Sequence, residues 1–209
     1  MEYIMDKAYA RELLERAYKQ NPGPWYKHSI KVAQATENII LEFMKQGYDV
    51  NDNLAYNAGL LHDIGRYKGV TKSVIHSYDL DQLGFRGNAI KCVTHSFPCR
   101  NKGIEIAADW SLVPPDMKMK LVVILNENSN YDLYDKVITL CDALADEKGF
   151  TTLEKRLISV GLRHGTNAHT SVHWKGFYEI KKEIESLIGM SVYRLLPDVE
   201  ESIYRDIGC

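Results

Sequence analysis

Apolar residues recur at intervals of three and four along almost the whole chain, and this spacing restricts the fold more than any other feature. Such spacing gathers apolar side chains on one face of a helix. The alternation of apolar and polar residues that is typical of a half-buried strand is nearly absent. The sequence therefore predicts an all-α fold.

Turn-forming residues divide the chain into expected helices. The run 121–125 is also expected to be helical, although a short buried strand fits it as well, and 98–116 is expected to be irregular because Pro114 and Pro115 interrupt it. The last long helix carries an apolar stripe of Phe177, Ile180, Ile184 and Leu187. The expected helices cover about 6–20, a long stretch from Pro24, a stretch from Asn51 or Asp52 to near Gly65, Ser73 to Leu83, 87–97, 130–147, 151–163 and 169–188.

The chain of 209 residues has no internal repeat, low-complexity tract or flexible linker, so we expect one domain over 1–209. Its helices from 151–209 are expected to pack on the preceding part. No stretch approaches 18 consecutive apolar residues, and the N-terminus lacks the apolar segment of a signal peptide. The four cysteines form no Cys-x-x-Cys pair. These features predict a cytoplasmic protein that does not enter membranes.

The net charge of −2 provides no field that would hold an extended nucleic acid. Locally, however, the stretch 66–102 carries seven Lys or Arg residues against two Asp residues. A small anionic ligand near this stretch and a solvated positive face both explain that excess.

Several histidine and aspartate residues fall on the apolar faces of the expected helices. A carboxylate buried there costs several kcal/mol unless a positive charge meets it. Neutral imidazoles and carboxylates together suit a divalent transition metal ion. Adjacent His62 and Asp63 can both reach such an ion only at the end of a helix. The residues in question are His28, His62, Asp63, His76, His95 and Asp142.

Each of these residues has a simpler explanation when it is taken alone. A single inward histidine is more often a hydrogen-bonded core residue, and Asp63 could cap a helix or orient its neighbour. His169 and His173 are four residues apart, but they have no third ligand nearby and are expected on the surface. The whole set is harder to obtain by chance, because five helices each present a metal-competent residue inward.

The series His28, His62-Asp63 and Asp142 resembles the HD-domain superfamily of metal-dependent phosphohydrolases. The His-Asp pair of the motif stands in Leu61-His62-Asp63-Ile64-Gly65, and the gaps before and after the pair are 34 and 79 residues. The resemblance covers about 24–147. It implies an HD-domain helical bundle in which these four residues bind a first divalent metal ion.

His76 and His95 are similar to the extra histidine pair of two-metal HD proteins, which include the HD-GYP phosphodiesterases and the di-iron hydrolases of symmetrical diadenosine tetraphosphate. This likeness implies that Asp63 bridges two ions and that His76 and His95 bind the second. The chain has no Gly-Tyr-Pro element, which disfavours a cyclic dinucleotide substrate. Iron or manganese is the expected metal, and zinc, nickel, cobalt and magnesium remain open.

The resulting hypothesis is a hydrolase that uses a metal-activated water to cleave a phosphoester or phosphoanhydride bond of a small nucleotide-like substrate. Asp63 and Arg66 are the expected catalytic residues. Arg66, together with Lys68 or Arg86, is expected to bind phosphoryl oxygens. Two alternative functions remain open, a one-metal HD 5′-nucleotidase and a non-catalytic nucleotide sensor. A homodimeric assembly is also open.

Overall fold

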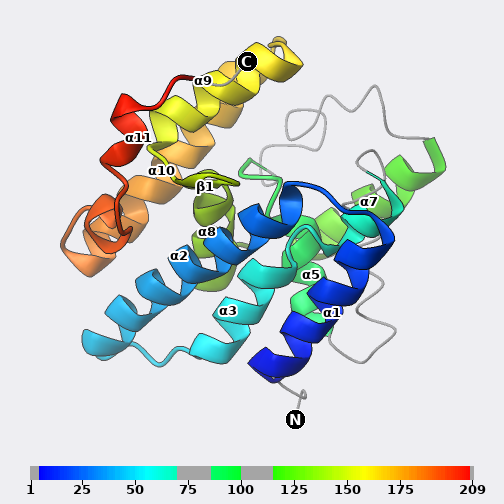
Figure 1. Cartoon of the computed structure of the whole chain (residues 1–209), viewed down its shortest axis with the longest axis horizontal. Helices are drawn as coiled ribbons and strands as arrows, with labels where there is room; N and C mark the ends of the chain where they lie inside the picture. Colours follow the sequence, from blue (N-terminus) through cyan, green and yellow to red (C-terminus); the bar gives the residue numbers. More distant parts are fainter. Residues whose placement is uncertain (1–4, 70–85, 100–114, 208–209) are drawn as a thin grey trace.

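Helix α2 (Trp25–Lys45) runs through the middle of the computed structural model, which describes residues 5–69, 86–99 and 115–207 (Figure 1). Helices α1, α3 and α5 lie toward one end of the molecule, and α9, α10 and α11 gather at the other. The elements are α1 (Lys7–Gln20), α3 (Asp52–Leu61), the 3-10 helix η1 (Ile64–Lys68), α5 (Arg86–Thr94), α7 (Pro115–Glu127), α8 (Leu133–Asp142), β1 (Ala145–Asp146), β2 (Gly149–Phe150), α9 (Leu153–His164), α10 (Thr170–Ile188), η5 (Val192–Leu195) and α11 (Glu201–Tyr204). The prediction of an all-α fold is confirmed, because strand is limited to one two-residue pair in the described part of the chain.

Side chains at the helix N-termini explain where several of these helices begin. The Asn51 carboxamide accepts a hydrogen bond from the Leu54 backbone N–H at 2.9 Å, at the start of α3. Asp132 and Asp135 form a reciprocal capping box at the start of α8. Each such cap satisfies a backbone donor that has no partner within the helix.

The close packing of α2 against α3 depends on Gly59. A Cβ atom at this position would lie 2.8 Å from Thr36 Oγ1 and 3.1 Å from the Ala33 Cα. Both neighbours belong to α2, and the second is a backbone atom that cannot rotate away. Glycine therefore permits the approach that brings the C-terminal end of α3 toward α2.

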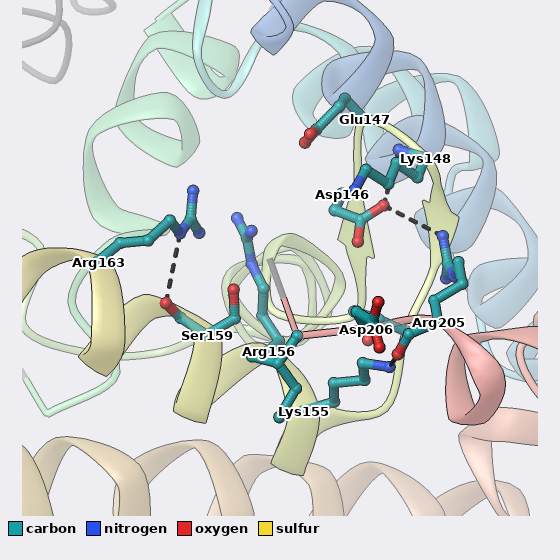
Figure 2. Close-up of a pocket in the computed structure, with 11 residues that line it drawn as sticks. Asp146, Glu147, Lys148, Lys155, Arg156, Ser159, Arg163, Arg205 and Asp206 are labelled. Atoms are coloured by element: carbon teal, nitrogen blue, oxygen red, sulfur yellow. Dashed lines mark hydrogen bonds and ion pairs between the residues drawn. The ribbon is translucent and has the colours of Figure 1, made fainter. Parts of the chain in front are cut away.

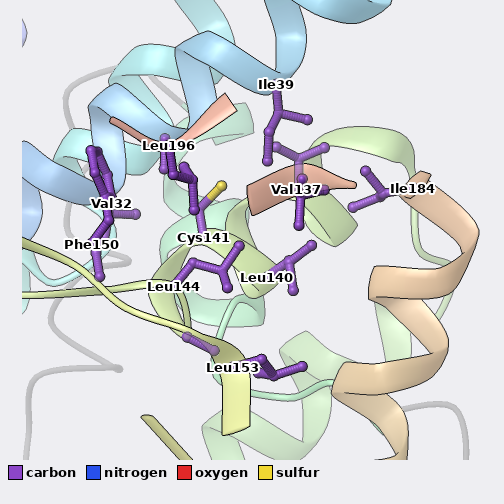
Figure 3. Close-up of a cluster of buried hydrophobic side chains, with 14 of the residues drawn as sticks. Val32, Ile39, Val137, Leu140, Cys141, Leu144, Phe150, Leu153, Ile184 and Leu196 are labelled. Carbon is purple, nitrogen blue, oxygen red and sulfur yellow. The ribbon is translucent and has the colours of Figure 1, made fainter. Parts of the chain in front are cut away.

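The buried apolar side chains form two clusters, one on each side of α2. The first joins α2 to α1, α3 and α5, and includes Leu14, Leu60 and Cys92. The second, shown in Figure 3, joins α2 to α8, the β1–β2 hairpin, α10 and η5, and includes Ile39 and Leu140. Together the clusters fix the relative positions of the helix ends that carry the polar residues described below.

A hairpin replaces the last part of the expected helix over 130–147, so that prediction is wrong at its end. Helix α8 stops at Asp142, and β1 pairs with β2 immediately afterwards. The Asp146 carboxylate accepts hydrogen bonds from the backbone N–H groups of Lys148 and Gly149 at 2.7 and 2.9 Å. This local turn, completed by Gly149 at φ 149°, competes with helix continuation.

The apolar face of α10 also differs in one position from the expected stripe. Ile180, Ile184 and Ile188 are buried at intervals of four, whereas Leu187 is 38% exposed. Residues 121–125 are helical within α7, as expected. The helix expected from Ser73 to Leu83 and most of the irregular stretch 98–116 lie outside the described residues. None of the described helices combines the length and the apolar character needed to cross a membrane.

Candidate metal centre

Four helix ends meet at a cluster of histidine and aspartate side chains. His28 lies in the first turn of α2, and His62 and Asp63 directly follow α3. His95 directly follows α5, and Asp142 is the last residue of α8. The three histidines and Asp63 are all buried. The structure therefore brings together five of the six sequence-predicted metal ligands.

The polar atoms of the cluster lie close to one another. His28 Nε2 is 2.9 Å from Asp142 Oδ1 and 3.2 Å from His62 Nε2. His62 Nε2 is also 3.5 Å from Asp142 Oδ1 and 3.7 Å from Asp63 Oδ2. The His95 ring packs edge-on against the His62 ring, with centroids 4.9 Å apart. Each histidine thus contacts at least one other member of the cluster.

Backbone carbonyl groups orient two of the imidazoles. His62 Nδ1 lies 2.7 Å from the Gly59 carbonyl oxygen, and His95 Nδ1 lies 2.7 Å from the Cys92 carbonyl oxygen. Since a carbonyl only accepts, these contacts place a proton on each Nδ1. In the neutral rings the Nε2 lone pairs are then left for a ligand or a donor. At His95 the Ser96 hydroxyl lies 3.0 Å from Nε2.

The protonation of the cluster reflects burial opposed by close opposite charges. Burial alone would lower the pKa of His62, but the Asp63 and Asp142 carboxylates raise it above its usual value. Burial, and then the neighbouring His62, lower the pKa of His95 to about 4. Burial would raise the pKa of Asp142, but hydrogen bonds from His28 and His62 hold it well below its usual value. The cluster thus contains an ionised carboxylate and a neutral imidazole in a buried environment.

The arrangement fits a divalent metal ion in three respects. His28, His62 and Asp63 offer ligand atoms within 4.8 Å of one another, and ligands that bind one ion at about 2.0–2.2 Å are themselves about 3–4 Å apart. The donor set of imidazole and carboxylate suits transition metals. Helices α3, α5 and α8 all end here, and the partial negative charges of their C-termini favour a cation.

Arg66 contacts the cluster through Asp63. Its Nε donates to Asp63 Oδ2 at 2.6 Å, and its side chain is 31% exposed. Burial would raise the pKa of Asp63, but His62, Arg66, His28 and His95 together lower it. The sequence pointed to both residues but missed the ion pair between them.

The remaining sequence-predicted residues are placed less closely or not at all. Lys68 ends η1 in an exposed position, with Nζ 5.2 Å from the centre of the Tyr67 ring. Arg86 is the first residue of α5, but its side chain is outside the described part of the chain, as is the whole of His76. His169 and His173 are partly buried around the start of α10, and the His173 ring stacks on Phe177.

A buried ion pair that the sequence did not predict joins the end of α5 that carries His95 to α8. Lys91 Nζ lies 2.9 Å from Asp135 Oδ2 and also contacts Asp132, which joins α5 to α8. The Thr94 hydroxyl donates to Asp135 Oδ1 at 2.7 Å. Lys91 and Thr94 come just before His95, so the pair fixes the end of α5 that carries the histidine. The only signal for it in the sequence is the Asp132–Asp135 spacing of a capping box.

Comparison with protein families identifies the family to which this part of the chain belongs. The HD domain family model matches residues 25–146, which is more than half of the chain. The matched span begins three residues before His28 and ends four residues after Asp142. Comparisons with curated proteins and with solved structures gave no match. The chain therefore belongs to the HD domain family.

Proposed function

We propose that this protein is a metal-dependent phosphohydrolase that cleaves a phosphoester or phosphoanhydride bond of a small nucleotide-like substrate. HD domains in general suggest metal-dependent phosphohydrolase activity. The observation that carries the proposal is the convergence of His28, His62 and Asp63, with ligand atoms within 4.8 Å of one another. Asp142 joins them through its contact with His28 at 2.9 Å.

In the proposed site His28, His62, Asp63 and Asp142 hold a first divalent ion. When bound, divalent ions supply charge neutralisation of phosphoryl oxygens and activation of a water nucleophile. The Gly59 carbonyl holds the His62 ring so that Nε2 faces the cluster. Because His62 is fully buried, this part of the site also excludes bulk water.

Arg66 is proposed to bind the phosphoryl group. A guanidinium carries five N–H donors, and the described contacts of Arg66 use Nε for Asp63. The other donors can therefore contact phosphoryl oxygens while Asp63 stays in position. Its partial exposure lets a substrate approach from solvent. Lys68 and Arg86 are proposed to add positive charge for the same ligand.

We further propose a second ion bound by His95 and His76 and bridged to the first by Asp63, as in the two-metal branch of the family. Support comes from the position of His95 beside His62 and from its neutral imidazole. The rival is a one-metal site of the 5′-nucleotidase kind. The Ser96 hydroxyl favours this rival, because it lies at hydrogen-bond distance from the Nε2 atom that a second ion would need.

The test combines metal analysis with a phosphate-release screen. The purified protein is assayed by elemental analysis and then with mononucleotides and dinucleoside polyphosphates in the presence of Fe(II) or Mn(II). We expect Asp63→Asn to lose both bound metal and phosphate release. The matched control is Asp49→Asn, which changes an exposed carboxylate on the loop after α2.

Three results separate the alternatives. Two ions per chain support the two-metal site, and one ion with full activity in His95→Ala supports the one-metal site. Tight nucleotide binding without phosphate release for any metal would support a sensor and contradict the proposal. Full phosphate release by Asp63→Asn would also contradict it.

A further inference from the structure

A separate cavity of about 260 Å³ lies between the β1–β2 hairpin, α9 and the C-terminal residues 205–207 (Figure 2). None of the metal-centre residues lines it. We call it the α9 pocket. Five cationic side chains line it, and they are Lys148, Lys155, Arg156, Arg163 and Arg205.

Helix α9 presents one polar face to this pocket. Arg156, Ser159 and Arg163 follow one another at intervals of three and four, so their side chains share one side of the helix. Figure 2 shows the two guanidinium groups extending from α9 on the same side, with the Ser159 hydroxyl between their bases. Arg156 and Arg163 are seven residues apart, about two helical turns, so α9 offers two cationic groups along one face.

Much of this positive charge has no internal partner. The Arg156 guanidinium and the Lys148 ammonium have neither an ion pair nor a hydrogen bond within the described residues. Arg163 Nε donates to the Ser159 carbonyl oxygen of its own helix, at 3.3 Å. Lys155 contacts the carbonyl oxygens of Ser202 and Arg205 rather than a carboxylate.

The three carboxylates of the pocket do not cancel this charge. They belong to Asp146, Glu147 and Asp206, against five cationic groups. Asp146 is engaged by Arg205, whose Nη1 lies 3.6 Å from Oδ1, and by two backbone N–H groups of the hairpin. The pocket therefore keeps an excess of positive charge on its α9 side.

The size and donor chemistry indicate which ligand fits. Pockets for whole drug-sized ligands measure about 300–1,000 Å³, and this cavity of about 260 Å³ is smaller. Guanidinium groups match the geometry of phosphoryl oxygens, and ammonium groups add charge. We propose that the α9 pocket binds one or two phosphoryl groups, either as free phosphate or pyrophosphate or as the distal phosphates of a nucleotide held at the metal centre.

The test is calorimetric titration of the metal-loaded full-length protein with pyrophosphate, with metal content measured afterwards to detect chelation. We expect Arg156→Ala/Arg163→Ala to weaken binding by about tenfold for each arginine removed. The control Arg194→Ala changes an exposed arginine of η5 and should stay within twofold of the wild type. Lys148→Glu, in the exposed hairpin turn, should weaken binding in the same direction without touching a helix.

A non-hydrolysable imido analogue of a nucleoside triphosphate distinguishes the two sources of the phosphoryl group. Affinity lost in both the double variant and Asp63→Asn supports the distal phosphates of a nucleotide, and affinity lost only in the double variant supports a free anion. Pyrophosphate affinity that is unchanged in both the double variant and Lys148→Glu would overturn the proposal. Affinity lost in Arg66→Ala but kept in the double variant would overturn it as well, because the anion would then lie at the metal centre. The pyrophosphate titrations are repeated with imidodiphosphate, whose bridging nitrogen resists hydrolysis. Binding is then measured without turnover, and the outcomes are independent of whether the metal centre hydrolyses a substrate.

Discussion

Replacing Lys91 by methionine should destabilise the protein strongly while leaving the size of the side chain nearly unchanged. The Lys91 and Asp135 side chains are only 11% and 3% exposed, and their charged atoms lie 2.9 Å apart. Without the lysine, Asp135 remains buried and keeps hydrogen bonds that include those from the Thr94 hydroxyl and the Asp132 backbone N–H. Removing one partner of a buried ion pair costs about 3–5 kcal/mol, and the hydrogen bonds that Asp135 keeps place this case at about 3 kcal/mol.

The free energy of unfolding is measured by urea denaturation followed by circular dichroism. For a chain of this size a loss of about 3 kcal/mol corresponds to a fall of about 6–12 °C in Tm. The matched control is Lys136→Met, which removes a more exposed ion pair between α8 and Glu183 of α10. It should cost no more than about 1 kcal/mol. A Lys91→Met variant within about 1 kcal/mol of the wild type would refute the reasoning.

Three further predictions follow from other parts of the structure. Gly59→Ala should destabilise the protein by about 1–3 kcal/mol in thermal melts, because its Cβ would meet α2 at 2.8 Å. The control Gly161→Ala in α9 should be neutral or stabilising, because the nearest atom to its Cβ would be 3.5 Å away. An equal loss of stability in both variants would contradict the packing argument. Burial raises the pKa of Cys141 to about 12 and raises the pKa of Cys92 further, so both thiols should stay protonated at pH 8. Peptide mass spectrometry should then find both thiols unlabelled by iodoacetamide until urea is added. Removing the metal ion with a chelator should lower Tm in a scanning fluorimetry assay. The free energy of unfolding should fall by about 4 kcal/mol if the free ion had been a thousandfold above its Kd. An unchanged Tm would argue against an ion that joins several helices.

The helical fold could be predicted from sequence because its signal is local. Intervals of three and four between apolar residues directly report a helix face, and the capping residue Asn51 marks the start of α3. The end of α8 was missed for the opposite reason. Helix periodicity continues past Asp142, while the competing turn depends on one carboxylate, that of Asp146, and on Gly149.

The candidate site was only partly accessible from sequence. His28, His62, Asp63 and Asp142 were identified by the resemblance to HD domains, and the structure gathers them. The Asp63–Arg66 ion pair depends on how the chain turns after α3, which spacing alone does not specify.

Counting charges along the chain does not show which cationic side chains are exposed to an anion. Lys91 contributed to the basic excess of 66–102, but in the structure it is buried against Asp132 and Asp135. The α9 pocket lies in another region, where the sequence carries an excess of only one, with four Lys or Arg against three Asp or Glu over 145–164. Its cations come from the hairpin, α9 and Arg205, and only folding brings them together.

The central claim is that His28, His62, Asp63 and Asp142 together bind a divalent metal ion. The most direct measurement is a crystal structure of the protein grown with Mn(II), with data collected for anomalous scattering. An anomalous peak within about 2.0–2.4 Å of His28 Nε2, His62 Nε2 and a carboxylate oxygen is the predicted result. A structure without a peak there, or with manganese bound only at another place, would contradict the claim.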